Sequence, residues 1–173
     1  MGFLAAALAS VPALAQGRPV PGAMLPQAQA GDVDAMMVVA SDYLRDPYGD
    51  HAEGYRWMMR AAACDGPGCI ASPDMLHSAR LSAASSLFYG VQHATRYVVL
   101  PDMMQVYVWM TIAQSAWSTR GEKPDYSLNF YKREAAARMT PAQIAEAGRR
   151  AAAWRPMSLE AVLRTPFDPP GQR

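Results

Sequence analysis

Residues 28–66 read AQAGDVDAMMVVASDYLRDPYGDHAEGYRWMMRAAACDG. Apolar residues recur at three- and four-residue spacing over residues 33–44, and again over residues 50–64. Between these segments lies Asp46-Pro47-Tyr48-Gly49, a composition typical of a turn. The stretch therefore predicts a helix, a turn and a second helix. Such a pair cannot bury its apolar faces alone, so we expect further helix pairs to stack against it.

The rest of the chain carries start signals for five more helices. Ser72-Pro73 places serine at an N-cap and proline at the first helical position, and Thr140-Pro141-Ala142-Gln143 is a capping box. No pair of strands is predicted, and residues 91–100 form a connector that is either extended or a final turn. We expect the further helices over residues 72–90, 101–117, 125–138, 140–154 and 158–164. The predicted fold class is all-α, a short α-solenoid of antiparallel helix pairs with six or seven helices.

Composition narrows the classes of function. The 173 residues are enough for one domain with its own core, and no apolar run reaches the length of a membrane span. The net charge of +1 does not favour binding to nucleic acid. Six basic and nine acidic residues lie before Arg120, and ten basic and six acidic residues lie from Arg120 onward. This asymmetry is either ordinary variation between helix faces or a basic C-terminal docking surface.

The N-terminus has the pattern of an export signal. The segment FLAAALASVPALA is apolar and ends in Ala13-Leu14-Ala15, with small residues where signal peptidase needs them, so that Gln16 would become the first residue. A buried N-terminal helix is the alternative interpretation. We expect a bacterial protein that is periplasmic or secreted. The expected organisation is a signal peptide over residues 1–15, a flexible lead-in over 16–27, a helical domain over 28–157, and a short helix with a loose, proline-rich tail over 158–173.

The two cysteines favour an oxidising compartment. Cys64 and Cys69 enclose Asp-Gly-Pro-Gly, and this spacing can close a small disulfide loop; two buried free thiols are the alternative. Two cysteines with no histidine nearby are not a typical metal site, and the three histidines share no metal-ligand spacing. We expect neither a metal nor a cofactor.

An internal repeat links the second and fourth predicted helices. Tyr55 and Trp57 recur as Tyr107 and Trp109 in the same Tyr-x-Trp pattern, with an alanine four residues after each tryptophan. In this pattern, and in the small residues of the preceding helices, residues 28–154 resemble the Sel1-like repeat family, a branch of the tetratricopeptide-like α-solenoids.

The resemblance implies a non-catalytic scaffold that binds a protein partner in a concave groove and serves an envelope or secretion assembly. Tyr55, Trp57, Tyr107 and Trp109 are the expected partner-binding residues, although tryptophans at helical spacing are also common packing residues. Two alternatives stay open. One is a permanent structural subunit of an envelope complex, and the other is an enzyme acting on cell-wall polymer through two carboxylates such as Glu53 and Asp102.

Overall fold

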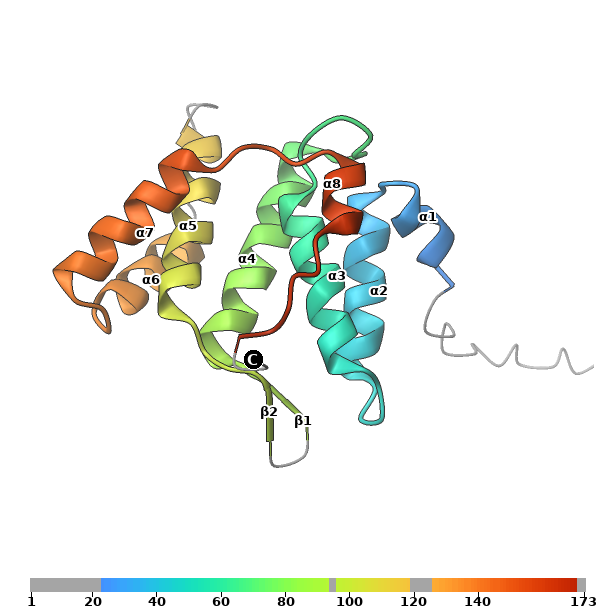
Figure 1. Ribbon diagram of the computed structural model, residues 1–173, viewed down its shortest axis with the longest axis horizontal. Helices are drawn as coiled ribbons and strands as arrows, with labels where there is room; N and C mark the ends of the chain where they lie inside the picture. Colours follow the sequence, from blue (N-terminus) through green and yellow to red (C-terminus); the bar gives the residue numbers. More distant parts are fainter. Residues whose placement is uncertain (1–22, 94–95, 119–125, 171–173) are drawn as a thin grey trace, which may run out of the picture.

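A computed structural model describes residues 23–93, 96–118 and 126–170, and it is mostly helical (Figure 1). The described helices are α1 (Leu25–Gln29), α2 (Val33–Arg45), α3 (His51–Ala63), α4 (Pro73–Tyr89), α5 (Met103–Ser118), α6 (Tyr126–Ala136), α7 (Pro141–Ala153) and α8 (Leu159–Arg164). The all-α prediction is confirmed. The predicted signal peptide lies outside the described residues, as do the first residues of the lead-in.

Local start signals fix where the helices begin. The Ser72 hydroxyl accepts a hydrogen bond from the Met75 backbone N–H at 3.1 Å, at the N-terminus of α4. At the start of α7 the Gln143 N–H donates to the Thr140 hydroxyl at 3.3 Å, and the Thr140 N–H donates to the Gln143 side chain at 2.8 Å. Both predicted caps are confirmed, and each satisfies backbone donors that have no partner within the helix.

Neighbouring helices pack in succession, α2 on α3, α3 on α4 and α4 on α5 (Figure 1). The pattern then changes, because α6 and α7 both pack on α5. Helix α5 therefore lies among three helices and is buried around most of its circumference. Its buried residues include Val106 and Met110, and also Val108, Trp109 and Ile112.

Helices α2 and α3 approach each other closely at Gly54. A Cβ at this position would lie 2.9 Å from Leu44 Cγ and 3.0 Å from Tyr43 Cβ. A side chain larger than hydrogen would force the two helices apart. The glycine thus sets the spacing of the first helix pair.

Two segments differ from the expectation for loops. A strand pair was not predicted, but β1 (Val91–His93) and β2 (Arg96–Val99) form a short antiparallel hairpin between α4 and α5. Gly90, directly after α4, has a φ of 73°, a conformation that glycine adopts without strain. Helix α1 also begins earlier than expected, because it includes the last three residues of the lead-in, 25–27, and it buries Ala28 against the core.

After α7 the chain returns to the N-terminal half of the molecule (Figure 1). The Met157 N–H donates to the Ala63 carbonyl at 3.3 Å, and the Leu159 N–H donates to the Pro67 carbonyl at 3.0 Å. Residues 165–170, called the C-terminal strap below, then run alongside α3 to the base of the hairpin. The prediction of a loose tail is wrong for the strap, since Pro169 is buried and the Pro170 carbonyl accepts a hydrogen bond from the Leu100 N–H at 3.3 Å.

Candidate functional site

A cavity of about 460 Å³ lies between α3, α5 and the C-terminal strap, and is called the α3–α5 cavity. Its walls are mainly apolar and aromatic, with a few polar groups, which is the usual character of a binding site. The lining residues are Tyr55, Met59, Ala63, Asp102, Gln105, Trp109, Trp154, Met157, Phe167, Asp168, Pro169 and Pro170.

Tyr55 forms part of the α3 wall. The Asp50 carboxylate accepts a hydrogen bond from the Glu53 N–H at 3.0 Å and so caps the start of this helix. Tyr55 lies one turn further on and is 3% exposed. Burial raises the pKa of its hydroxyl well above the ordinary value, and the negative charge of Asp102 raises that pKa further. The hydroxyl is therefore a neutral group at physiological pH.

Asp102 fixes the start of α5 at the edge of the cavity. Its backbone N–H donates to the Leu87 carbonyl in α4 at 2.9 Å, and its carboxylate accepts from the Gln105 N–H at 3.0 Å. Gln105 and Trp109 are four residues apart and so share one face of the helix. The Trp109 indole nitrogen is buried and has no hydrogen-bond partner within the described part of the chain.

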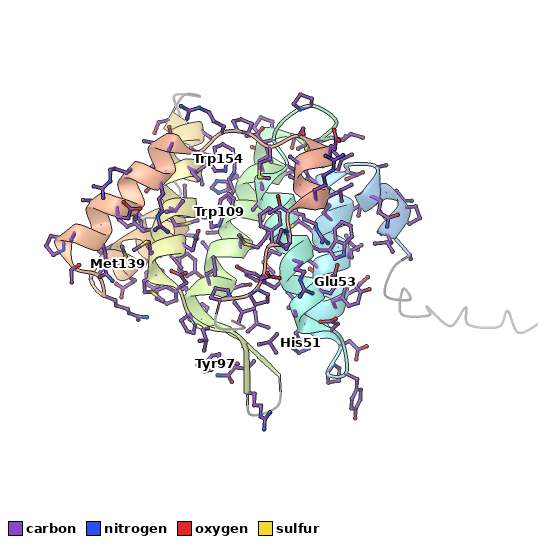
Figure 2. The ribbon with its side chains drawn as sticks, in the orientation of Figure 1. His51, Glu53, Tyr97, Trp109, Met139 and Trp154 are labelled. Atoms are coloured by element: carbon purple, nitrogen blue, oxygen red, sulfur yellow. A yellow bond between two sulfur atoms is a disulfide. The ribbon has the colours of Figure 1, made fainter. Side chains whose placement is uncertain are left out.

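Trp154 forms the wall beyond the end of α7. Its ring meets that of Trp109 edge-on, with 6.4 Å between ring centroids and 67° between ring planes; both residues are labelled in Figure 2. The Arg80 guanidinium lies over the Trp154 ring, 4.9 Å from its centroid. Arg80 is 2% exposed and also donates to the Asp65 carboxylate at 2.7 Å and to the Ala62 carbonyl at 3.3 Å. A single arginine in α4 thus joins the end of α3 to Trp154.

Sequence reasoning did not identify Arg80 as important. Its only signal is a long basic side chain between Ala79 and Ala83, on the face of α4 that the spacing of small residues predicts to be buried. An arginine at a buried position needs a partner, and two acids, Asp65 and Asp74, precede it within fifteen residues.

The C-terminal strap supplies the outer wall. Phe167 has a φ of 45°, in the left-handed region that residues other than glycine seldom adopt. This conformation persists only where surrounding contacts hold it, and here the flanking residues are held by α8 on one side and by Leu100 on the other. The wall of the cavity is thus a constrained segment.

The structure brings together two of the four predicted partner-binding residues, Tyr55 and Trp109. Trp57 and Tyr107 do not line the cavity, because residues two positions apart on a helix point in nearly opposite directions. Trp57 is 4% exposed, with the Arg60 guanidinium 4.7 Å from its ring centroid, and Tyr107 lies below the Lys132 ammonium at 5.2 Å. Partner binding by the four residues stays a prediction.

Cys64 and Cys69 are joined by a disulfide, as the spacing predicted. The enclosed turn has Gly68 at a φ of 84°, and the Cys69 N–H donates to the Gly66 carbonyl at 3.1 Å. The loop begins directly after Ala63 and therefore braces one rim of the α3–α5 cavity. The alternative of two free thiols does not apply.

Comparisons with family models, curated proteins and solved structures give no match to the chain. The chemistry of the site must therefore be argued from its own residues. Within the described ranges, no helix combines the length and apolar character needed to cross a membrane. The described residues also contain no group of three or more histidine, cysteine, aspartate or glutamate side chains placed to hold a metal ion.

The two carboxylates considered for an enzyme have different surroundings. Glu53 is absent from the α3–α5 cavity and pairs with Arg56 at 3.2 Å and with Arg60 at 3.0 Å. Asp102 lines the cavity and caps α5. The cavity therefore does not bring Glu53 and Asp102 together.

Proposed function

We propose that the protein is a non-catalytic scaffold for protein–protein interaction, which a bacterium exports to the periplasm or secretes and which serves an envelope or secretion assembly. The α3–α5 cavity is the part that contacts the partner. Tyr55 and Trp109 are its partner-binding residues, whereas Trp57 and Tyr107 support the helices that carry them.

The observation that carries the proposal is the concentration of destabilising features around one cavity. The buried Trp109 nitrogen without a partner and the left-handed backbone at Phe167 both line it. Each lowers stability, by about 1–3 kcal/mol for an unpaired buried donor and by a similar amount for such a backbone conformation. Departures of this kind gather at functional sites, where a surface is shaped for a ligand and not for stability.

The proposed location rests on the chemistry of two segments. A disulfide in a small loop is stable in an oxidising compartment, such as the periplasm or the medium. The segment FLAAALASVPALA supports export. N-terminal sequencing of the mature protein from its host should find Gln16 first, and a chain that retains Met1 would contradict export by signal cleavage.

A capture experiment with a matched pair of variants tests the scaffold. Gln105→Arg puts a large side chain into the α3–α5 cavity, and Gln29→Arg makes the same change at the exposed end of α1. Both variants should show wild-type circular dichroism. Partners recovered from an envelope extract with the wild type and with Gln29→Arg should be lost with Gln105→Arg. Equal recovery with both variants would refute the assignment of the cavity.

A further inference from the structure

We infer that the α3–α5 cavity receives a positively charged side chain, a lysine ammonium or an arginine guanidinium, from the polypeptide partner. The inference rests on the proposed scaffold function and specifies which part of the partner is recognised. It follows from the charge of the walls, from their aromatic content and from the size of the cavity.

The ionisable groups of the cavity are acidic. Asp102 and Asp168 line it, and no lysine, arginine or histidine is among the described residues that do. Neither aspartate forms an ion pair within the described part of the chain. Both carboxylates lack a cation beside them and attract positive charge, and the half-buried Asp102 does so more strongly than it would in open solvent.

Nearby cations of the protein itself are already engaged. Arg80 donates to the Asp65 carboxylate, and Arg60 donates to Glu53. Neither arginine lines the cavity. The charge of Asp102 and Asp168 is therefore available to a cation that comes from outside the described structure.

The remaining walls suit the same ligand. Tyr55, Trp109, Trp154 and Phe167 supply aromatic rings, which attract ammonium and guanidinium groups through their electron-rich faces. The Arg80 guanidinium over Trp154 shows that a contact of this kind already forms at one of these rings. Aromatic rings together with carboxylates distinguish a cation from a neutral side chain of the same shape.

The size of the cavity fits one long side chain better than a folded surface. Its volume of about 460 Å³ falls within the range of roughly 300–1,000 Å³ found for small-ligand sites. The long stem of lysine or arginine can contact Met59 and Met157 in the apolar walls while its charged end meets the acids.

Short peptides of matched shape test the inference without knowledge of the partner. The probes are acetyl-Gly-Xaa-Gly-amides, in which Xaa is arginine or its neutral isostere citrulline, and lysine or its neutral analogue norleucine. Two-dimensional NMR follows the indole N–H signals of the four tryptophans. Trp109 and Trp154 report on the cavity, and Trp57 and Trp117, which do not line it, serve as internal references.

The arginine and lysine peptides should shift the Trp109 and Trp154 signals in a saturable way. Citrulline and norleucine should bind at least about tenfold more weakly, and binding of the charged peptides should weaken as salt is raised. Equal affinity for the charged and neutral peptides would overturn the inference. So would the absence of any saturable shift at the highest soluble peptide concentration.

A charge-matched pair of variants tests the two aspartates. Asp102→Asn with Asp168→Asn removes both carboxylates, and asparagine still serves as an N-cap for α5. Asp34→Asn with Asp42→Asn changes the net charge equally on α2, outside the cavity. The first pair should weaken binding of the arginine peptide at least about tenfold, and the second pair should weaken it less than about twofold. Asp168→Asn alone, at an exposed position, should give part of the loss without any question of folding.

The result also separates this inference from the proposed function. If a partner from the envelope extract is lost with Gln105→Arg but still binds after both aspartates are replaced, the scaffold stands and the cationic ligand is refuted. If the peptides bind through the aspartates but no captured protein depends on Gln105, the cationic site stands and the assignment of the cavity as the partner-binding part of a scaffold is refuted.

Discussion

Reduction of the Cys64–Cys69 disulfide should lower the free energy of unfolding by about 2 kcal/mol. The crosslink joins residues separated by five positions, so it closes a small loop in the unfolded chain. In the chain-entropy model a loop of about six residues restricts the unfolded chain by roughly 7 cal/mol/K, or about 2 kcal/mol at 25 °C. The folded loop should persist after reduction, because backbone hydrogen bonds from Leu159 to Pro67 and from Ile70 to Gly31 also hold it.

Urea denaturation of the oxidised and reduced protein measures the effect. With a denaturant slope of about 2 kcal/mol/M, the midpoint of the reduced protein should fall by roughly 1 M. In a thermal scan the same loss corresponds to roughly 4–8 °C. Circular dichroism before denaturation should be unchanged, since the crosslink acts mainly on the unfolded state.

The control is a protein that cannot form the crosslink. Cys64→Ala with Cys69→Ala should unfold at the same urea concentration with and without reductant. Identical midpoints for oxidised and reduced wild type would refute the reasoning, as would a reductant effect of equal size in the double variant. A loss of native helicity on reduction would show that the crosslink holds the folded loop itself.

Three further predictions concern packing and charge. Arg80→Met should lower the free energy of unfolding, measured in urea, by about 3 kcal/mol. This is the lower end for a broken buried ion pair, because the Asp65 side chain is 33% exposed. A loss below about 1 kcal/mol would contradict the role assigned to Arg80. Gly54→Ala should destabilise the fold by roughly 1–3 kcal/mol, because its Cβ clashes with α2. Gly148→Ala should stabilise α7 by up to about 1 kcal/mol, because nothing lies within 4 Å of the new Cβ. In thermal melts, a stabilised Gly54→Ala and a destabilised Gly148→Ala would refute both assignments. Because burial raises the pKa of Tyr55, its neutral form stabilises the fold below the unfolded pKa of about 10, and this contribution is lost as pH rises above it. The free energy of unfolding of Tyr55→Phe should fall less steeply with pH in that alkaline range than that of the wild type. An unchanged pH profile would contradict this assignment.

The parts of the fold that depend on local sequence could be predicted. The N-caps at Ser72 and Thr140 use side chains three residues or fewer from the groups they satisfy, so the sequence contains the whole interaction. The turn that holds Cys64 and Cys69 is local in the same sense. The hairpin was missed because its strands are short and no Asn-Gly turn signals it.

The candidate site could be predicted only in part, because it is built from distant segments. The Tyr-x-Trp repeat identified Tyr55 and Trp109, but it did not show which side of each helix faces the other. The strap reaches the site through bonds such as that from Leu100 to Pro170, and its proline content indicated a loose tail when judged alone. Arg80 joins elements that are remote in sequence, so no local pattern reveals its role.

The return of the chain after α7 has a consequence for biosynthesis. Met157 contacts the loop that contains Cys69, 88 residues earlier. As the chain leaves a ribosome or a translocon, this loop emerges long before the residues that follow α7. The loop carbonyls that later accept hydrogen bonds from those residues are therefore exposed to water until the later residues emerge. Chaperones and oxidoreductases would meet the cysteines in that interval, and the N-terminal helix pairs would acquire their last stabilising contacts after a delay set by the rate of elongation.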